Sequence, residues 1–153
     1  MLTKTPFSPV ASLFEKSITI DAPPPVVWDA LTRLELMKQW MAEPELRLDI
    51  ITDWTVGGPI VIRGFHHVEF ENRGTVLEFD PNRVLRYTHL SSLSRLPDRP
   101  EHYSIIDFRL VPVGSQTSLT LMVSNFPTDT IQKHLNFYWR TTLAILKNVI
   151  ESE

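Results

Sequence analysis

The apolar and polar positions near the C-terminus follow the period of an amphipathic helix. At 100° per residue, the side chains that share one broad stripe in residues 129–150 are Ile131, Leu135, Tyr138, Trp139, Thr142, Ile145, Leu146, Val149 and Ile150. Lys133 and Lys147 fall on the opposite side. Asp129 followed by Gln132 is typical of a capping box at a helix start. We therefore predict one long helix over residues 129–150, with Asp129 as its cap.

This stripe needs a surface to cover it, because its nine side chains represent roughly 15–25 kcal/mol of transfer free energy. The strand-rich chain between residues 46 and 126 is the expected surface. Phe137 and Leu143 lie off the stripe. We expect these two side chains to contact either a loop or a partner subunit, and the second case would make the protein a homodimer.

The chain upstream of this helix has the pattern of strands joined by short turns. Phe14, Ile18 and Ile20 alternate with polar residues and predict a first strand, which the prolines that follow Ala22 end. Gly114 and Ser115 form the tight connection of a hairpin, and residues 91–101 form the longest predicted loop. The predicted helices span residues 26–32 and 35–41, and the further strands span residues 45–53, 60–66, 71–80, 83–90, 102–113 and 116–126.

This order of elements predicts an α+β fold in which a curved antiparallel sheet of about seven strands wraps around the long C-terminal helix. Two short helices follow the first strand. Such a sheet does not close perfectly around one rod, so we predict an apolar cavity at one end. Residues 13–153 are expected to form a single domain, and residues 1–12 an N-terminal arm.

Composition excludes several classes of function. A net charge of −3 and a pI near 5.9, with scattered basic residues, argue against nucleic acid as a partner. The chain has no cysteine, so thiol catalysis and disulfides are excluded. No apolar run approaches the ~18 residues of a membrane span, and the N-terminus lacks a signal peptide. We expect a cytoplasmic protein that does not bind membranes.

Several local phrases resemble those of a known family, and they run from about residue 18 to residue 151. These phrases are Ala22-Pro23, Val27-Trp28-Asp29-Ala30-Leu31-Thr32, Trp40, Trp54, Gly57-Gly58, Gly74-Thr75-Val76-Leu77-Glu78-Phe79-Asp80-Pro81, Leu85, Tyr87, Thr117, Leu119, Trp139, Leu143 and Lys147. In order and spacing they are similar to the START/Bet v 1-like superfamily with its helix-grip fold, in the branch of Hsp90 ATPase activator homologues. The resemblance implies a cavity between the sheet and the last helix, but it does not imply one particular function.

The sequence departs from the family pattern at three positions that the resemblance places in the cavity. Tyr138 stands where the family usually has glycine, which implies a smaller cavity with a hydroxyl inside it. His89 stands where tryptophan is frequent, and Val123 stands where histidine is common.

Motifs for metal binding and catalysis are missing. His66 and His67 are adjacent and would point to opposite faces of a strand, so they cannot chelate a metal together. No serine lies in a nucleophile elbow, and Asp107 is expected to face solvent by strand parity. Glu78 has Arg63 or Arg86 as its expected ion-pair partner. We therefore assign no catalytic residue, no metal site and no cofactor.

The surplus of aromatic residues carries the functional prediction. We predict a non-catalytic protein that binds a small hydrophobic or aromatic molecule in the cavity. The predicted ligand-binding residues are Trp40, Trp54, Arg63, His66, Tyr87, His89, Phe108, Val123 and Tyr138. Two alternatives stay open: a protein-interaction module with a chaperone partner, and an enzyme similar to the cyclases and hydratases of the superfamily. The enzyme would need a buried ionisable residue, for which Glu78 or His89 is the candidate.

Overall fold

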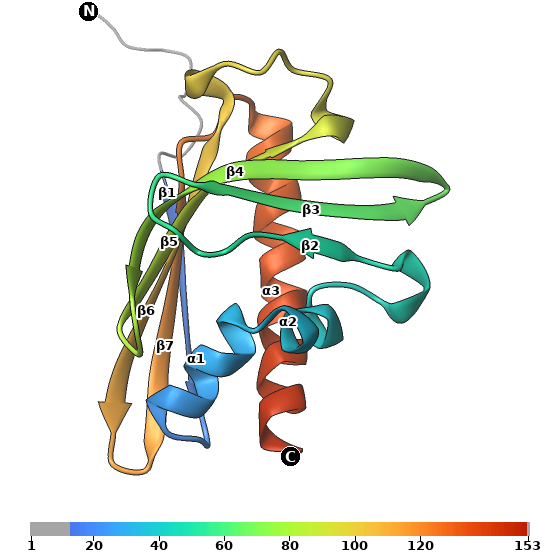
Figure 1. Cartoon of the computed structure of the whole chain (residues 1–153). Helices are drawn as coiled ribbons and strands as arrows, with labels where there is room; N and C mark the ends of the chain where they lie inside the picture. Colours follow the sequence, from blue (N-terminus) through green and yellow to red (C-terminus); the bar gives the residue numbers. More distant parts are fainter. Residues whose placement is uncertain (1–12, 153) are drawn as a thin grey trace, which may run out of the picture.

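The computed structural model describes residues 13–152, apart from the side chain of His66, and confirms the predicted α+β fold (Figure 1). Its α-helices and strands in chain order are β1 (Leu13–Ile20), α1 (Pro24–Thr32), α2 (Leu34–Trp40), β2 (Asp49–Ile51), β3 (Pro59–His66), β4 (Val68–Asp80), β5 (Val84–Ser91), β6 (Ser104–Val113), β7 (Gln116–Ser124) and α3 (Asp129–Glu151). Short 3₁₀ turns are η1 (Pro44–Leu46), η2 (Ser92–Ser94) and η3 (Pro100–His102). The predicted arm, residues 1–12, lies outside the described residues.

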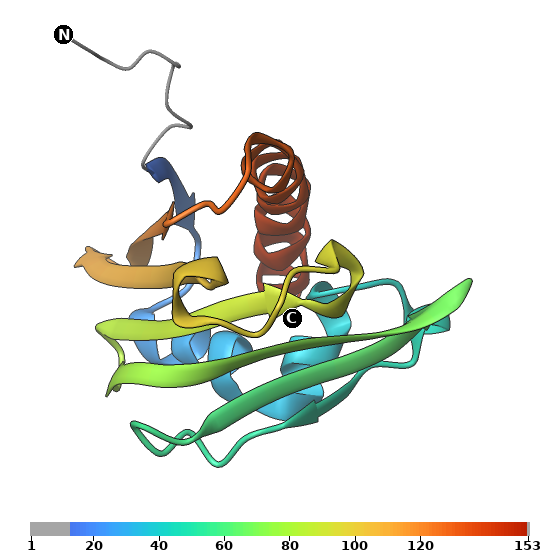
Figure 2. The same ribbon diagram turned by 90° about the horizontal axis from the view of Figure 1, so that it is seen from above.

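The seven strands form one antiparallel sheet in the order β1-β7-β6-β5-β4-β3-β2. Seen from above, the sheet bends around α3, with β1 and β7 on one side of the helix and β3 and β4 crossing the molecule below it (Figure 2). Helices α1 and α2 cover the remaining part of the concave side (Figure 2). The predicted arrangement of a curved sheet around a C-terminal helix is therefore confirmed.

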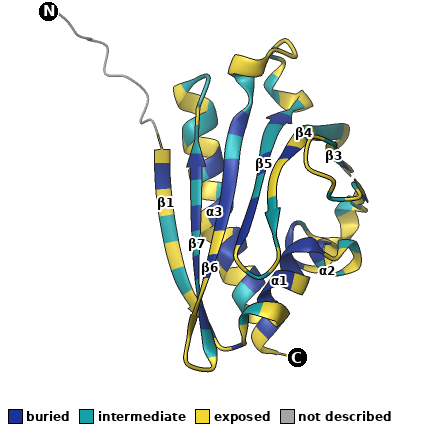
Figure 3. Cartoon of the chain, turned by 60° about the vertical axis from the view of Figure 1, so that its left-hand side comes forward, coloured by how far each residue is buried: buried dark blue, intermediate teal, exposed yellow. Residues whose placement is uncertain are grey.

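The core lies between the concave face of the sheet and α3. Strands alternate buried and exposed positions, as Figure 3 shows by colour, because successive side chains point to opposite faces. Buried side chains of the central strands and α3 include Val76, Leu85, Tyr87, Ile106, Phe108, Leu119, Leu121, Val123, Trp139 and Leu146. The candidate site lies on this packed face.

The start and the buried stripe of α3 differ in detail from the prediction. Thr128, rather than Asp129, is the N-cap, and its hydroxyl accepts a hydrogen bond from the backbone N–H of Ile131 at 3.1 Å. Leu143 is only 3% exposed, whereas Ile145 is 41% exposed, so the sequence prediction for these two residues is wrong. The helix contacts α1 and α2 as well as β1, and the buried stripe is therefore rotated toward Leu143. Phe137 is off the stripe, as predicted.

The predicted strand over residues 45–53 is mostly wrong. Pro44 begins the 3₁₀ turn η1, and Arg47, which follows this turn, has a left-handed backbone with φ of 51°. Both features prevent extended pairing, so that β2 contains only Asp49–Ile51. The other predicted helices and strands are confirmed, with bounds that differ by a few residues.

Strands β4 and β5 approach each other unusually closely beside the candidate site. A Cβ atom at Gly74 would lie 1.7 Å from the carbonyl oxygen of Thr88, so no other residue fits there without a backbone shift. The register then shifts between Val76 and Glu78, as in a β-bulge. Val76 is left directly opposite Tyr87.

Candidate functional site

Three polar side chains lie next to one another on the concave face of β5 and β6. Tyr87 and His89 alternate along β5, and the register pairs Tyr87 with Ile106 and His89 with Ser104 on β6. Directly paired residues share a face of the sheet, with Cβ atoms about 4.5–5.5 Å apart. Because Ile106 belongs to the core, this register places the tyrosine, the histidine and the serine on the side that faces α3.

Tyr87 has a buried hydroxyl without a partner. Its side chain is 4% exposed, and the hydroxyl makes no hydrogen bond to any residue within 13–152. Burial, and then the neighbouring Tyr138 of α3, raise the pKa of Tyr87 well above its usual value. The hydroxyl is therefore neutral at every physiological pH and can both donate and accept a hydrogen bond.

His89 is half-buried and is held in its neutral form. Burial lowers the pKa of His89 to about 4, and His134 of α3 contributes to this shift. The imidazole makes no hydrogen bond in the described part of the chain. A neutral imidazole has one donor and one acceptor nitrogen, so His89 offers both functions toward α3.

Ser104 was missed as a site residue by the sequence reasoning. Its side chain is 1% exposed, and its hydroxyl has no hydrogen-bond partner among the residues that the structure describes. The signal was present in the alternation of β6, because Ser104 continues the apolar series of Ile106, Phe108 and Leu110. A polar residue in phase with a core series is expected on the core side of the strand.

Tyr138 of α3 is a neighbour of Tyr87, but its hydroxyl already has a hydrogen-bond partner. It donates a hydrogen bond of 2.6 Å to the carbonyl oxygen of Met41, just after α2. Burial raises the pKa of Tyr138 to about 12. The ring lies edge-on to Trp139 with centroids 5.0 Å apart. Tyr138 therefore ties α3 to the end of α2 and forms one wall of the site.

Aromatic side chains form the apolar surroundings. Trp139 contacts Trp40 and Phe108, with ring centroids 6.2 Å and 5.5 Å away. Nε1 of Trp40 donates a hydrogen bond to the carbonyl oxygen of Ala30 at 2.8 Å, and Val123 is completely buried. Of the predicted site residues, Trp40, Phe108 and Val123 are thus packed core residues, which can shape the site from behind.

Trp54 lies beside Tyr87, one of the three polar side chains on the concave face of β5 and β6. Its ring centroid is 6.2 Å from that of Tyr87 and 5.7 Å from that of Phe79. The backbone of Trp54 is left-handed, with φ of 59°, which is rare for a bulky residue. Nε1 donates a hydrogen bond to the carbonyl oxygen of Thr32 at 2.7 Å, and the backbone N–H donates one to the Thr52 hydroxyl at 3.0 Å. These bonds hold the half-buried indole beside Tyr87.

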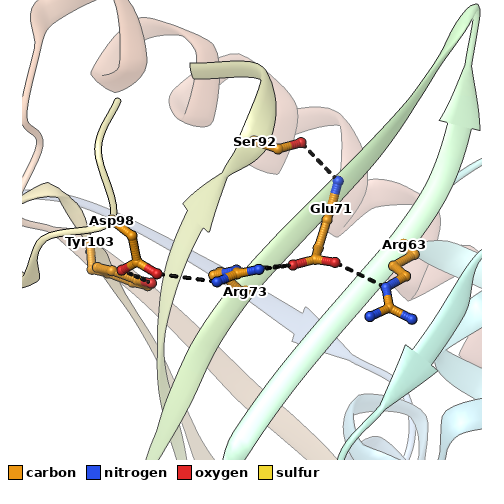
Figure 4. A network of polar contacts seen from close by, with 6 residues as sticks. All are labelled: Arg63, Glu71, Arg73, Ser92, Asp98 and Tyr103. Atoms are coloured by element: carbon orange, nitrogen blue, oxygen red, sulfur yellow. Dashed lines mark hydrogen bonds and ion pairs between the residues drawn. The ribbon is translucent and has the colours of Figure 1, made fainter. Parts of the chain in front are cut away.

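The predicted polar anchor Arg63 lies on the other face of the sheet. Its Nε contacts Oε1 of Glu71 at 3.0 Å, and Glu71 also pairs with Arg73 (Figure 4). Arg73 continues this network to Asp98, whose other oxygen accepts from the Tyr103 hydroxyl (Figure 4). Arg63 is therefore not grouped with Tyr87 and His89. The side chain of His66 lies outside the described part.

Two open grooves of the described chain lie near this network. One has a volume of about 430 Å³ and the other of about 280 Å³. The larger is lined by Arg47, Asp49, Arg63, Gly64, Phe65, Glu69, Phe70, Glu71 and Ser92. Neither groove is lined by Tyr87, His89 or Tyr138. An apolar cavity between the sheet and α3 therefore stays a prediction.

Carboxylates of the central strands lie on the convex face. Asp107 is on that face, as predicted, but it is only 6% exposed, because Arg86 and Arg109 cover it at 3.3 Å and 3.0 Å. Its expected exposure to solvent is thus wrong. Glu78 is exposed and pairs in register with Arg86, and Arg63 is engaged by Glu71 instead. Glu78 is therefore not the buried acid that an enzyme of this fold would need.

Two further observations concern metal binding and membrane-spanning helices. Among residues 13–152, no group of three or more His, Cys, Asp or Glu side chains is placed to hold a metal ion. None of the described helices combines the length and the apolar character needed to cross a membrane.

The chain is similar to a well-defined set of proteins. A family model described as "Activator of Hsp90 ATPase homolog 1-like protein" matches residues 21–151. A search of curated proteins found no significant match.

Solved structures of similar proteins extend this result. A protein from Cytophaga hutchinsonii is 30% identical, with a TM-score of 0.77 over 94% of this chain and 97% of that one. The Aha1 dimer from Colwellia psychrerythraea is 26% identical, with a TM-score of 0.72 over 91% and 96% of the two chains. A protein from Chromobacterium violaceum has the same fold, with a TM-score of 0.79 at 19% identity over 92% and 97% of the chains.

Proposed function

The chain belongs to the Activator of Hsp90 ATPase homolog 1-like protein family. On that premise we propose that it binds a small apolar or aromatic molecule between the concave face of the sheet and α3, without catalysis. The observation that supports this most strongly is the buried, unpartnered hydroxyl of Tyr87 beside the neutral His89. A cytoplasmic site of action stays a prediction.

The missing partner of the Tyr87 hydroxyl has an energetic cost. Buried polar groups in folded proteins are almost always hydrogen-bonded, and leaving one unsatisfied costs about 1–3 kcal/mol. The described chain supplies no partner for the Tyr87 hydroxyl, although the neighbouring Tyr138 hydroxyl has one in Met41. A ligand that brings its own hydrogen-bonding group would recover this cost.

The surroundings suit an apolar body attached to that group. Trp54 and Tyr138 are both neighbours of Tyr87, and Tyr138 packs on Trp139, which in turn packs on Phe108. Aromatic walls with a few convergent polar groups are typical of small-molecule sites.

A fluorescent probe tests this function. N-phenyl-1-naphthylamine is neutral, apolar and weakly fluorescent in water, and Trp54 and Trp139 can transfer excitation energy to it at short range. We expect saturable binding of one probe per chain, with probe emission on excitation of tryptophan. Native mass spectrometry should show the same stoichiometry. A linear, non-saturating signal without energy transfer would contradict the proposal.

A second candidate function is a protein-interaction module, as the family description suggests for its members. The observation in its favour is the β3–β4 hairpin, where Phe65 and Val68 are both 53% exposed beside the larger groove. The purified protein should then stimulate the ATPase of an Hsp90 chaperone, and Phe65→Ser should abolish that stimulation. Wild-type protein without any effect on the ATPase would remove this candidate.

A homodimer is the remaining partner prediction. Phe137 on the outer side of α3 is 63% exposed, and one similar protein is described as a dimer. Sedimentation equilibrium of the wild type and of Phe137→Ser would decide the case. A monomer at all concentrations would exclude it.

A further inference from the structure

The unpartnered polar groups of β5 and β6 form one compact patch. Ser104 is the direct cross-strand neighbour of His89, and Tyr87 is two residues from His89 along β5. Direct neighbours have Cβ atoms about 4.5–5.5 Å apart, and residues two apart on a strand are separated by about 6.6 Å. One hydroxyl-sized group could therefore reach more than one member of this patch, which we call the Tyr87–His89–Ser104 patch.

The patch is uncharged. The Tyr87 hydroxyl and the His89 imidazole are both neutral at pH 7, and the Ser104 hydroxyl does not ionise. The nearest arginines along the strands, Arg86 and Arg109, lie on the opposite face, where Asp107 engages both. A carboxylate or an ammonium group at the patch would lose its hydration without gaining an opposite charge.

Each member of the patch can donate and accept. The two hydroxyls have this capacity, and the neutral imidazole has one nitrogen of each kind. An ether or carbonyl group only accepts, so it would leave the acceptor nitrogen of His89 without a donor. An alcohol or phenol hydroxyl supplies both functions.

We propose that the Tyr87–His89–Ser104 patch is the polar end of the ligand site and selects an uncharged ligand that carries an alcohol or phenol hydroxyl. Ser104 is the new member of this site, buried at 1% exposure with no protein partner within the described residues. This inference rests on the proposed function, because it specifies the ligand class for the same face.

Three probes with the same ring system test the selectivity. They are 2-naphthol, 2-methoxynaphthalene, which lacks the donor, and 2-naphthoate, which is an anion. Titrations followed by ¹H–¹⁵N correlation spectra give the dissociation constant Kd for each. We expect 2-naphthol to bind about 3- to 10-fold more tightly than 2-methoxynaphthalene, as one additional neutral hydrogen bond would give. We expect 2-naphthoate to bind more weakly than either.

Two variants remove single oxygen atoms from the patch. Ser104→Ala and Tyr87→Phe should each reduce the advantage of 2-naphthol over 2-methoxynaphthalene, while the Kd of 2-methoxynaphthalene stays within about twofold of wild type. Ser118→Ala is the matched control, because Ser118 lies on the opposite face of β7, next to Val111. It should leave all three constants unchanged.

The possible failures are distinguishable. If the wild type binds 2-naphthol and 2-methoxynaphthalene equally well, or if both variants keep the wild-type ratio, the inference about the patch is overturned while ligand binding stands. If 2-naphthoate binds most tightly, the inference is overturned as well. If no probe binds, the proposed function and the inference fail together.

Discussion

Strands β5 and β6 carry polar side chains on both faces, and the two sets differ in their partners. On the convex face, Asp107 contacts both Arg86 and Arg109. On the concave face, Tyr87, His89 and Ser104 have no hydrogen-bond partner within residues 13–152. Asp107 is buried beneath its two arginine partners, whereas Tyr87 and Ser104 are buried with hydroxyls that have no partner in the described part of the chain. The polar groups without partners thus lie on the face that packs against α3.

This difference indicates that the concave groups are not retained for stability. A buried hydroxyl without a partner costs free energy, and an apolar residue of the same shape would remove this cost. Proteins commonly accept such costs at functional sites. The four predictions below test this contrast between the two faces, beginning with the largest effect.

Truncation on the concave face should be far more destabilising than truncation on the convex face. Phe108 is 1% exposed and packs on Trp139, so Phe108→Ala should lower the free energy of unfolding by about 3–5 kcal/mol. Val111 on the same strand is 56% exposed, and Val111→Ala should change the free energy of unfolding by less than about 0.5 kcal/mol. Urea unfolding measures both variants. Equal losses would contradict a core restricted to the concave face.

His89 should make stability depend on pH. Between pH 6.5 and pH 4 the unfolded chain protonates this histidine and the folded chain does not, so protons favour unfolding. Its contribution, at most about 3 kcal/mol, is complete above pH 6.5 and is lost as the pH falls toward 4. Stability of the wild type should therefore fall more steeply over this range than that of His89→Gln. Parallel pH profiles of wild type and His89→Gln would contradict this prediction.

Tyr87 and Tyr138 should respond to loss of their hydroxyls in opposite directions. Tyr138→Phe removes the hydrogen bond to Met41 and should destabilise the protein by about 1 kcal/mol. Tyr87→Phe removes an unpartnered hydroxyl and should stabilise it by a similar amount, about 1 kcal/mol. Thermal unfolding of the two variants beside wild type measures the difference. A destabilised Tyr87→Phe would mean that its hydroxyl is already satisfied in the folded protein.

The network around Glu71 should contribute least. Hydrogen bonds from Arg73 and then Arg63 lower the pKa of Glu71, but these side chains are exposed and screened by solvent. Glu71→Gln should shift Tm by no more than about 2 °C at physiological salt, and by less at 1 M salt. Lys133→Gln, in another exposed pair, is the matched control. A large shift that persists in high salt would show that the convex network is a structural element.

The sequence predicted the fold well because its periodic signals are long. The 3.6-residue period of residues 129–150 defines α3 almost to its ends, and the strand alternation defines most of the sheet. Local backbone chemistry limited the rest: the left-handed Arg47 shortens β2, and the Thr128 side chain caps α3. Neither effect has a periodic signature.

The candidate site was only partly predictable. Tyr87 was predicted from the surplus of aromatic residues, and His89 and Tyr138 were predicted as departures from the family pattern that the sequence resembles. Arg63 was placed with them, but the cross-strand register pairs it with Glu71 on the convex face. Ser104 was missed: the alternation of β6 places it on the core side, but its position opposite His89 depends on the register between β5 and β6, which residue type alone does not give.

The most direct test of the central claim is to locate the binding face by amide chemical-shift changes on titration with 2-naphthol. We predict that the shifts concentrate in β5, in the first half of β6 and in α3, around Tyr87, Ser104 and Tyr138. Shifts confined to the open groove around Arg63 and Glu71, with the concave face unaffected, would contradict the account.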